Sequence, residues 1–158
     1  MSATTDTARV LVVDDVPEIL DLFKGLMRRV RVMPVQLVTE VNSQRAKELA
    51  ASEPFDLVIS DFRMRQVDGV EVLLAACGRN PSGRRVLMTG YNEVPTGIHR
   101  IQAARIDAYV QKPLRSQEVL QLVLDMLQGS AAALDDSRAR AREMESSAVR
   151  ESTGLGLS

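Results

Sequence analysis

The sequence predicts an α/β fold in which a parallel sheet is wound in both directions and covered by helices on both faces. The first observation is that short apolar runs alternate with longer stretches whose apolar residues recur at helical spacing. Such alternation is typical of parallel strands joined by right-handed helical crossovers. The second observation is that the short runs are almost continuously apolar, as strands covered on both faces require. The predicted class is therefore a doubly wound (βα)5 parallel sheet.

Each expected element has its own local signal. Strands are expected at residues 10–13, 35–39, 56–61, 86–88 and 106–111, and helices at about residues 17–30, 43–50, 70–77, 92–105 and 116–127. Pro17 suits the first turn of a helix, where its missing N–H costs nothing. Asn42 or Ser43 can cap the second helix, and Ser116 can cap the last one. Pro95 and Gly97 are poor helix formers, so an atypical helix is expected at residues 92–105.

The length of 158 residues fits one domain of common size with a short appendage. We expect a flexible N-terminus at residues 1–8, a folded domain at residues 9–128 and a charged tail at residues 129–158. In the tail, Ala139, Ala141 and Met144 form an apolar stripe that is too thin to bury. The tail is therefore expected to be disordered or a fraying helix.

The composition excludes several classes of function. Twenty basic and 21 acidic residues give a net charge of −1, so no overall field attracts nucleic acid or an anionic membrane. Aromatic residues make up 3% of the chain and Trp is absent, which argues against a surface that stacks on bases. No apolar run has the length of a membrane span. The single Cys77 excludes an internal disulfide, and a cytoplasmic location is expected.

Polar side chains stand where four of the predicted strands end. Asp14 and Asp15 follow the first strand, Asp61 the third, Thr89 the fourth and Lys112 the fifth. The carboxyl ends of parallel strands meet at one edge of the sheet, so these groups are expected to form a site. Three converging carboxylates need a cation to remain ionised together, and oxygen ligands at a small open site suit Mg²⁺. The carboxylate of Asp61 is the best placed nucleophile, which would give an aspartyl phosphate.

With these residues in order, residues 9–128 resemble the receiver domain of two-component response regulators. The matching positions are Asp14-Asp15, Asp61, Asp68-Gly69, Thr89-Gly90, Tyr109 and Lys112-Pro113. The resemblance implies a flavodoxin-like sheet with strand order 2-1-3-4-5. It also implies that Asp61 accepts a phosphoryl group from the phosphohistidine of a sensor histidine kinase or a histidine phosphotransfer protein in a phosphorelay.

The resemblance assigns roles to the other positions as well. Asp15, Asp61 and the backbone carbonyl of Arg63 would bind Mg²⁺ directly, and Asp14 would act through water. Lys112 would pair with the phosphoryl group, and the peptide bond between Lys112 and Pro113 would be cis. Thr89 would move toward the phosphoryl group while Tyr109 turns inward. Catalysis would be limited to the protein's own phosphorylation and dephosphorylation.

The same resemblance predicts how the phosphorylated state is read. A downstream protein would contact the face formed by residues 92–105, 106–111 and 116–128, with no direct role for nucleic acid or a membrane. The wide apolar stripe of residues 116–128 also leaves a homodimer interface open. No output domain follows residue 128, so a stand-alone receiver is expected, and a fragment of a larger response regulator is the alternative.

Some positions depart from the family's pattern. Arg65 follows Met64 where proline is common, and Arg105 replaces a glycine that usually closes the fourth helix. Arg63 and Tyr91 flank the expected phosphoryl position, so we hypothesise that they slow the attack of water. A pseudo-receiver that binds a partner without phosphotransfer is a second function class. A metal-dependent phosphatase is a third, but such enzymes carry a second acid two residues after the nucleophile, where this chain has Arg63.

Overall fold

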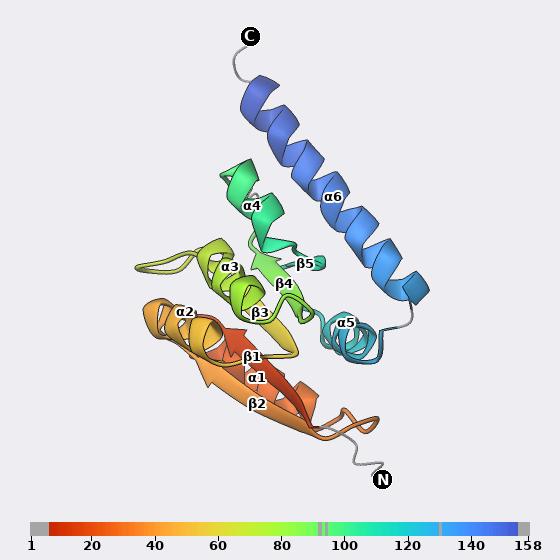
Figure 1. The fold of residues 1–158 in the computed structure, drawn as a ribbon. Helices are drawn as coiled ribbons and strands as arrows, with labels where there is room; N and C mark the ends of the chain where they lie inside the picture. Colours follow the sequence, from red (N-terminus) through yellow and green to blue (C-terminus); the bar gives the residue numbers. More distant parts are fainter. Residues whose placement is uncertain (1–6, 92, 94, 130, 155–158) are drawn as a thin grey trace.

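A computed structural model describes residues 7–91, 93, 95–129 and 131–154. Within these residues, five parallel strands form one sheet with the order β2-β1-β3-β4-β5, and helices connect them (Figure 1). The elements in chain order are β1 (Ala8–Val13), α1 (Pro17–Met27), β2 (Val35–Glu40), α2 (Ser43–Ser52), β3 (Leu57–Asp61), α3 (Gly69–Arg79), β4 (Arg84–Thr89), α4 (Ile98–Ala104), β5 (Ala108–Gln111), α5 (Ser116–Gln128) and α6 (Ala131–Gly154). The predicted fold class and strand order are confirmed.

The sheet separates two apolar layers, because successive side chains of a strand point to opposite faces. On one face, Val10 and Val12 of β1 pack with α1 and α5. On the other, Leu11 and Val13 pack with α2, α3 and α4. The side chains of residues 10–13 are all fully buried. Packing on both faces of the sheet therefore holds β1, and with it the residues that follow its end, in place.

The helix starts largely follow the local signals. Pro17 is the first residue of α1. The side chain of Asn42 accepts a hydrogen bond from the backbone of Arg45 and caps α2, as the sequence predicts. The expected cap at Ser116 is wrong, since Arg115 precedes α5 without a side-chain capping bond and Ser116 is the first helical residue.

Helix α4 is shorter than the predicted helix at residues 92–105. It begins only at Ile98, because Gly97 has a φ of 81°, in the left-handed region that a helix cannot include. At its other end Arg105 also takes a left-handed conformation, with a φ of 49°. The guanidinium of Arg85, a buried residue of β4, donates to the carbonyl oxygens of Ala104 at 2.7 Å and Arg105 at 3.2 Å. This side chain satisfies carbonyl groups that a helix end leaves without partners.

Of the two expectations for the tail, disorder or a fraying helix, the structure has a helix. Residues Ala131–Gly154 form the long helix α6, which leaves α5 and passes beside β5 and α4 (Figure 1). Ala141, placed in a stripe expected to be too thin to bury, is 1% exposed, whereas Met144 is 43% exposed. Of the three residues of that stripe only Ala141 is buried, because the side of α6 that faces the sheet carries Leu134, Ser137 and Ala141.

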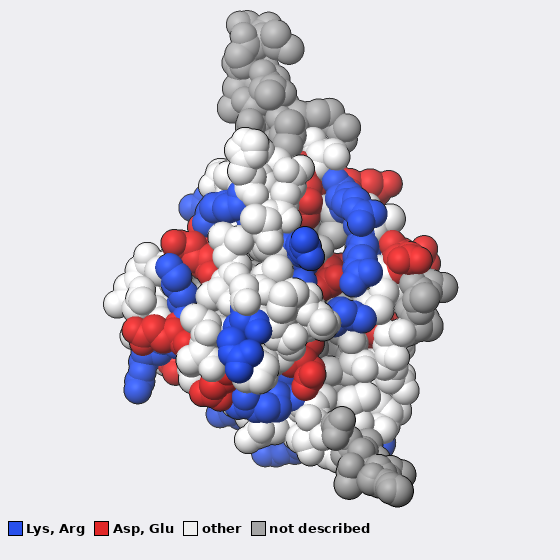
Figure 2. Space-filling view, in the orientation of Figure 1, with Lys and Arg blue, Asp and Glu red and all other residues white. Residues whose placement is uncertain are grey.

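The surface carries both charge signs. Figure 2 shows basic and acidic side chains interspersed over the face in view, in agreement with the net charge of −1. Among the described residues, no helix combines the length and the apolarity that crossing a bilayer requires.

Candidate functional site

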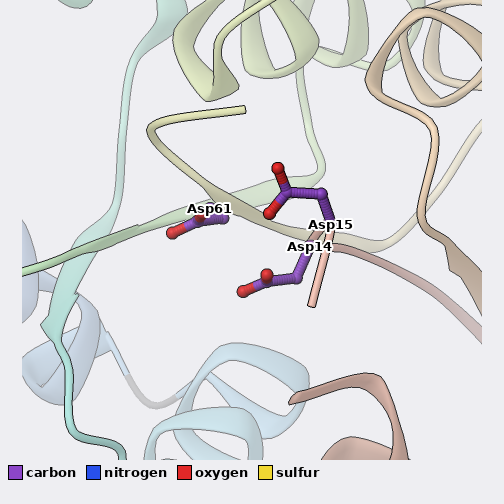
Figure 3. A group of neighbouring side chains, drawn as sticks. All are labelled: Asp14, Asp15 and Asp61. Carbon is purple, nitrogen blue, oxygen red and sulfur yellow. The ribbon is translucent and has the colours of Figure 1, made fainter. Parts of the chain in front are cut away.

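Three carboxylates meet where β1 and β3 end (Figure 3). Asp14 and Asp15 follow the last residue of β1, and Asp61 is the last residue of β3. One carboxylate oxygen from each lies within 4.8 Å of those from the other two. Asp14 is fully buried, Asp61 is 6% exposed and Asp15 faces solvent. The structure therefore brings together the three acids that the sequence predicts as a cluster.

Lys112 supplies positive charge to this cluster. Its Nζ donates to Oδ2 of Asp14 at 2.7 Å and lies 3.1 Å from Oδ1 of Asp61. β5 places Lys112 there, because its backbone N–H continues the ladder by donating to the carbonyl of Thr89 at 2.7 Å. The following Lys112–Pro113 peptide bond is cis.

The three carboxylates carry more negative charge than the single ammonium of Lys112 can balance. An oxygen-only donor set with surplus negative charge, two buried carboxylates and one open to solvent suits Mg²⁺, which keeps several of its waters. The residues present therefore fit the metal that the sequence analysis expects.

The surroundings of Asp61 disfavour the ionised form of its carboxylate. Burial, and then the nearby charge of Asp14, raise the pKa of Asp61 from 3.8 to about 6, although Lys112 acts in the opposite direction. At pH 7 the side chain is still mostly ionised, as a nucleophile must be.

This pKa predicts a stability effect for Asp61→Asn in metal-free buffer. The folded protein binds a proton on Asp61 more tightly than the unfolded chain does. The stabilisation from this proton is present below about pH 4 and is lost as the pH rises through about 6. The variant should therefore be more stable than the wild type at pH 7, by about 1–3 kcal/mol, with the difference vanishing near pH 4. Urea denaturation at both pH values measures this, and equal stability at pH 7 would contradict it.

Thr89 and Tyr109 point to the same side of the sheet. Thr89 ends β4 and is 2% exposed. Leu87 lies two residues earlier on β4, on the same face as Thr89, and the strand register pairs Leu87 with Tyr109 of β5. Burial, together with Glu145 nearby, raises the pKa of Tyr109, so its phenol is protonated and donates to Oε2 of Glu145 at 3.1 Å.

Sequence reasoning missed Glu93. Its Oε1 accepts a 2.6 Å hydrogen bond from the backbone N–H of Gly90, next to Thr89, and its charge contributes to the raised pKa of Asp61. Its Oε2 lies 3.5 Å from Nε of Arg63, whose side chain is 71% exposed. Glu93 belongs to a loop, where no periodic pattern could have indicated that its side chain contacts Gly90.

Hydrogen bonds hold the connection between β3 and α3, which follows Asp61, at several points. Gly69 N–H donates to the carbonyl of Phe62 at 2.8 Å. Asp68 caps α3 by accepting from the N–H of Glu71 at 3.1 Å, and its carboxylate also accepts two hydrogen bonds, of 2.8 and 2.6 Å, from Arg100 of α4. The Asp68-Gly69 pair thus joins the β3–α3 connection to α4.

A helix of the same chain packs on the face that the sequence analysis predicts as the partner-binding surface. This helix, α6, packs on α4, β5 and α5, the three elements of that face. No residue pattern indicates this arrangement, because the buried stripe of α6 contains serine and alanine.

Comparisons with known proteins agree with this geometry. The family model described as "Response regulator receiver domain" matches residues 10–124. Among solved structures, the signal receiver domain of an HD domain-containing protein from Pseudomonas fluorescens Pf-5 is 28% identical, with a TM-score of 0.65. That match covers 78% of this chain and 96% of the solved one. The response regulator TrrA from Thermotoga maritima, solved in complex with Mg²⁺-BeF, is 28% identical with a TM-score of 0.63, over 75% and 98% of the two chains.

Curated relatives match over a similar length of this chain. The response regulator protein PilR of Pseudomonas aeruginosa is 29% identical over 119 residues, which is 75% of this chain and 26% of the relative. The transcriptional regulatory protein ZraR of Klebsiella oxytoca is 33% identical over 115 residues, 73% of this chain and 25% of the relative. This chain spans about a quarter of the length of these relatives. It belongs to the response regulator receiver domains of two-component systems.

Proposed function

We propose that this chain accepts a phosphoryl group on Asp61 from a sensor histidine kinase or a histidine phosphotransfer protein and signals through protein–protein contact. The observation that carries the proposal is a buried, mostly ionised Asp61 at the end of β3, with Lys112 and two more acids around it. In the transfer, an oxygen of the Asp61 carboxylate forms a bond to phosphorus. The bond from phosphorus to the histidine nitrogen breaks, and the nitrogen keeps the electron pair.

Each neighbour of Asp61 has a separate part in this proposal. Lys112, within 3.1 Å of the Asp61 carboxylate, stabilises the negative charge that arrives with the phosphoryl group. Asp15, Asp61 and the Arg63 backbone carbonyl would hold Mg²⁺, with Asp14 acting through water. When bound, the metal supplies charge neutralisation at the phosphoryl oxygens. The complex of TrrA with Mg²⁺-BeF supports this assignment.

Thr89 and Tyr109 would report the phosphorylated state. Thr89 offers a hydroxyl for a phosphoryl oxygen, and its movement would make room for Tyr109 on the same side of the sheet. A downstream protein would then read the face of α4, β5 and α5, and a homodimer could use the same face. We assign this receiver activity to residues 9–128. A cytoplasmic location follows from the proposed donors, since kinases draw phosphoryl groups from ATP inside the cell.

The test is the intact mass of the protein after incubation with acetyl phosphate, with and without Mg²⁺. The wild type should gain one phosphoryl group when Mg²⁺ is present, and none when it is chelated. Asp61→Asn should gain none under either condition, because the amide is not a nucleophile that can form the acyl phosphate.

Asp56→Asn is a matched control. Asp56 is an exposed acid that precedes β3, and its carboxylate accepts from the N–H of Arg9 at the opposite edge of the sheet. This variant should become phosphorylated as the wild type does. An unmodified wild type would favour a pseudo-receiver, and modification of Asp61→Asn would place the phosphoryl group elsewhere.

A further inference from the structure

Helix α6 packs on the face made by α4, β5 and α5 (Figure 1), and it contacts this face through a narrow stripe of its own residues. Its buried side chains are Leu134, Ser137 and Ala141, at spacings of three and four residues that place them on one side of the helix. Glu145 continues the stripe one turn later and is half-buried. One face of α6 is therefore fitted to this surface.

Two polar contacts fix α6 along β5. Nε of Arg138 donates to Oδ1 of Asp107 at 2.8 Å, and Asp107 is itself buried, with its other oxygen accepting from the N–H of Arg85 at 2.9 Å. The second contact is the 3.1 Å bond from the Tyr109 hydroxyl to Glu145. Arg138 and Glu145 are seven residues apart, about two helical turns, so they lie on the same side of α6. The two contacts set both the position and the rotation of the helix.

The packing on either side of the stripe is incomplete. A groove of about 680 Å³ separates α6 from α5 and is lined by Gln111, Leu122 and Met144 among others. A second groove of about 550 Å³ separates it from α4 and is lined by Arg105 and Arg142 among others. A helix with a narrow apolar stripe and open flanks buries little surface, so its attachment depends strongly on the two polar contacts.

We propose that the face of α4, β5 and α5 is a helix-binding surface whose resident occupant is α6, and that phosphoryl transfer to Asp61 detaches the Glu145 end of α6 from it. A downstream partner thus binds where α6 now lies. The inference rests on the proposed function for its trigger. The docking of α6 rests on the described contacts alone.

Tyr109 connects the trigger to the helix. It shares a face of the sheet with Thr89, and its hydroxyl is the group that α6 holds through Glu145. Inward rotation of Tyr109 takes the hydroxyl away from Glu145 and breaks that bond. The contact between Arg138 and Asp107 is not affected by this rotation, so α6 stays attached near Ser137 while its later turns are released.

Hydrogen exchange of the full chain, read by mass spectrometry over residues 134–147, tests the docking first. Glu145→Ala should make the amides of residues 141–147 exchange about 2- to 10-fold faster, as the loss of one hydrogen bond implies. Alanine is the best helix former, so weaker intrinsic helicity cannot produce this result. Tyr109→Phe should give the same change. Glu145→Gln, whose amide oxygen still accepts, should exchange like the wild type.

Glu143→Ala is the matched control, because Glu143 lies on the same helix and is exposed. Its exchange should equal that of the wild type. If Glu143→Ala and Glu145→Ala accelerate exchange equally, or if neither does, the contact with Tyr109 does not hold α6 and the inference is overturned.

The trigger is tested on wild-type protein treated with acetyl phosphate and Mg²⁺, with the adduct confirmed by intact mass in the same sample. Faster exchange of residues 141–147 in the adduct, by about 2- to 10-fold, supports the inference. An adduct with unchanged exchange overturns it and leaves the proposed function standing. Absence of an adduct overturns the proposed function and the trigger together, while the Glu145 variants still decide whether the tyrosine contact holds α6.

Discussion

Replacing Gly69 with alanine is expected to destabilise the protein by about 3 kcal/mol, because the site has no room for a methyl group. A Cβ at Gly69 would lie 2.1 Å from the backbone oxygen of Asp61 and 2.8 Å from Cδ1 of Leu87. Backbone atoms cannot rotate away as the end of a side chain can, so α3 must shift relative to β3. Urea denaturation measures the loss, and phosphoryl uptake should fall as well, since the displaced backbone carries Asp61.

Gly78→Ala is the control within the same helix. A Cβ at Gly78 meets no atom within 4 Å, so alanine there should stabilise the protein by about 0.5–1 kcal/mol through its lower unfolded-state entropy. If the two variants have the same midpoint, the close approach of α3 to the end of β3 does not constrain the fold.

Lys112→Ala is expected to slow phosphoryl uptake from acetyl phosphate by about 100-fold or more, the usual cost of removing one preorganised charge partner of a transition state. The ammonium of Lys112 forms ion pairs with both Asp14 and Asp61. In the absence of metal, the loss of Lys112 also removes a charge that lowers the pKa of Asp61. The initial rate of adduct formation, followed by intact mass with Mg²⁺ present, measures the effect.

Lys47→Ala removes the same side chain from a different environment. Lys47 forms a 3.8 Å ion pair with Glu71, and both side chains are about 40% exposed, so the change should leave uptake within about twofold of the wild type. A Lys112 variant as fast as the Lys47 variant would exclude Lys112 from the transfer step.

The sequence was sufficient to predict the sheet and the gathering of the acids. Asp14, Asp61 and Lys112 each follow an apolar run, and a parallel sheet brings the ends of such runs to one edge whatever the details of packing. These predictions depend on periodicity, which a single chain displays directly. The roles of Thr89 and Tyr109 came from the family resemblance.

Other features depend on contacts between distant segments and left no pattern in the chain. The burial of Ala141 requires the surface that β5 offers, and the apolar content of α6 alone is too low to indicate it. Glu93 reaches the N–H of Gly90 from a loop. The late start of α4 follows from the left-handed conformation of Gly97, whereas Pro95 alone is compatible with a first helical turn.

The buried Arg85 of β4 holds the carboxyl end of α4 in place. Its guanidinium donates to the carbonyl groups of Ala104 and Arg105, so the carboxyl end of the helix is bonded to a buried side chain. Nearer the amino end, Arg100 forms an ion pair with Asp68, and their side chains are 29% and 26% exposed and therefore open to competition from water and salt. The two ends of α4 therefore differ in their attachment: a buried cation holds the carboxyl end, whereas an ion pair that salt can weaken holds the part nearer the amino end.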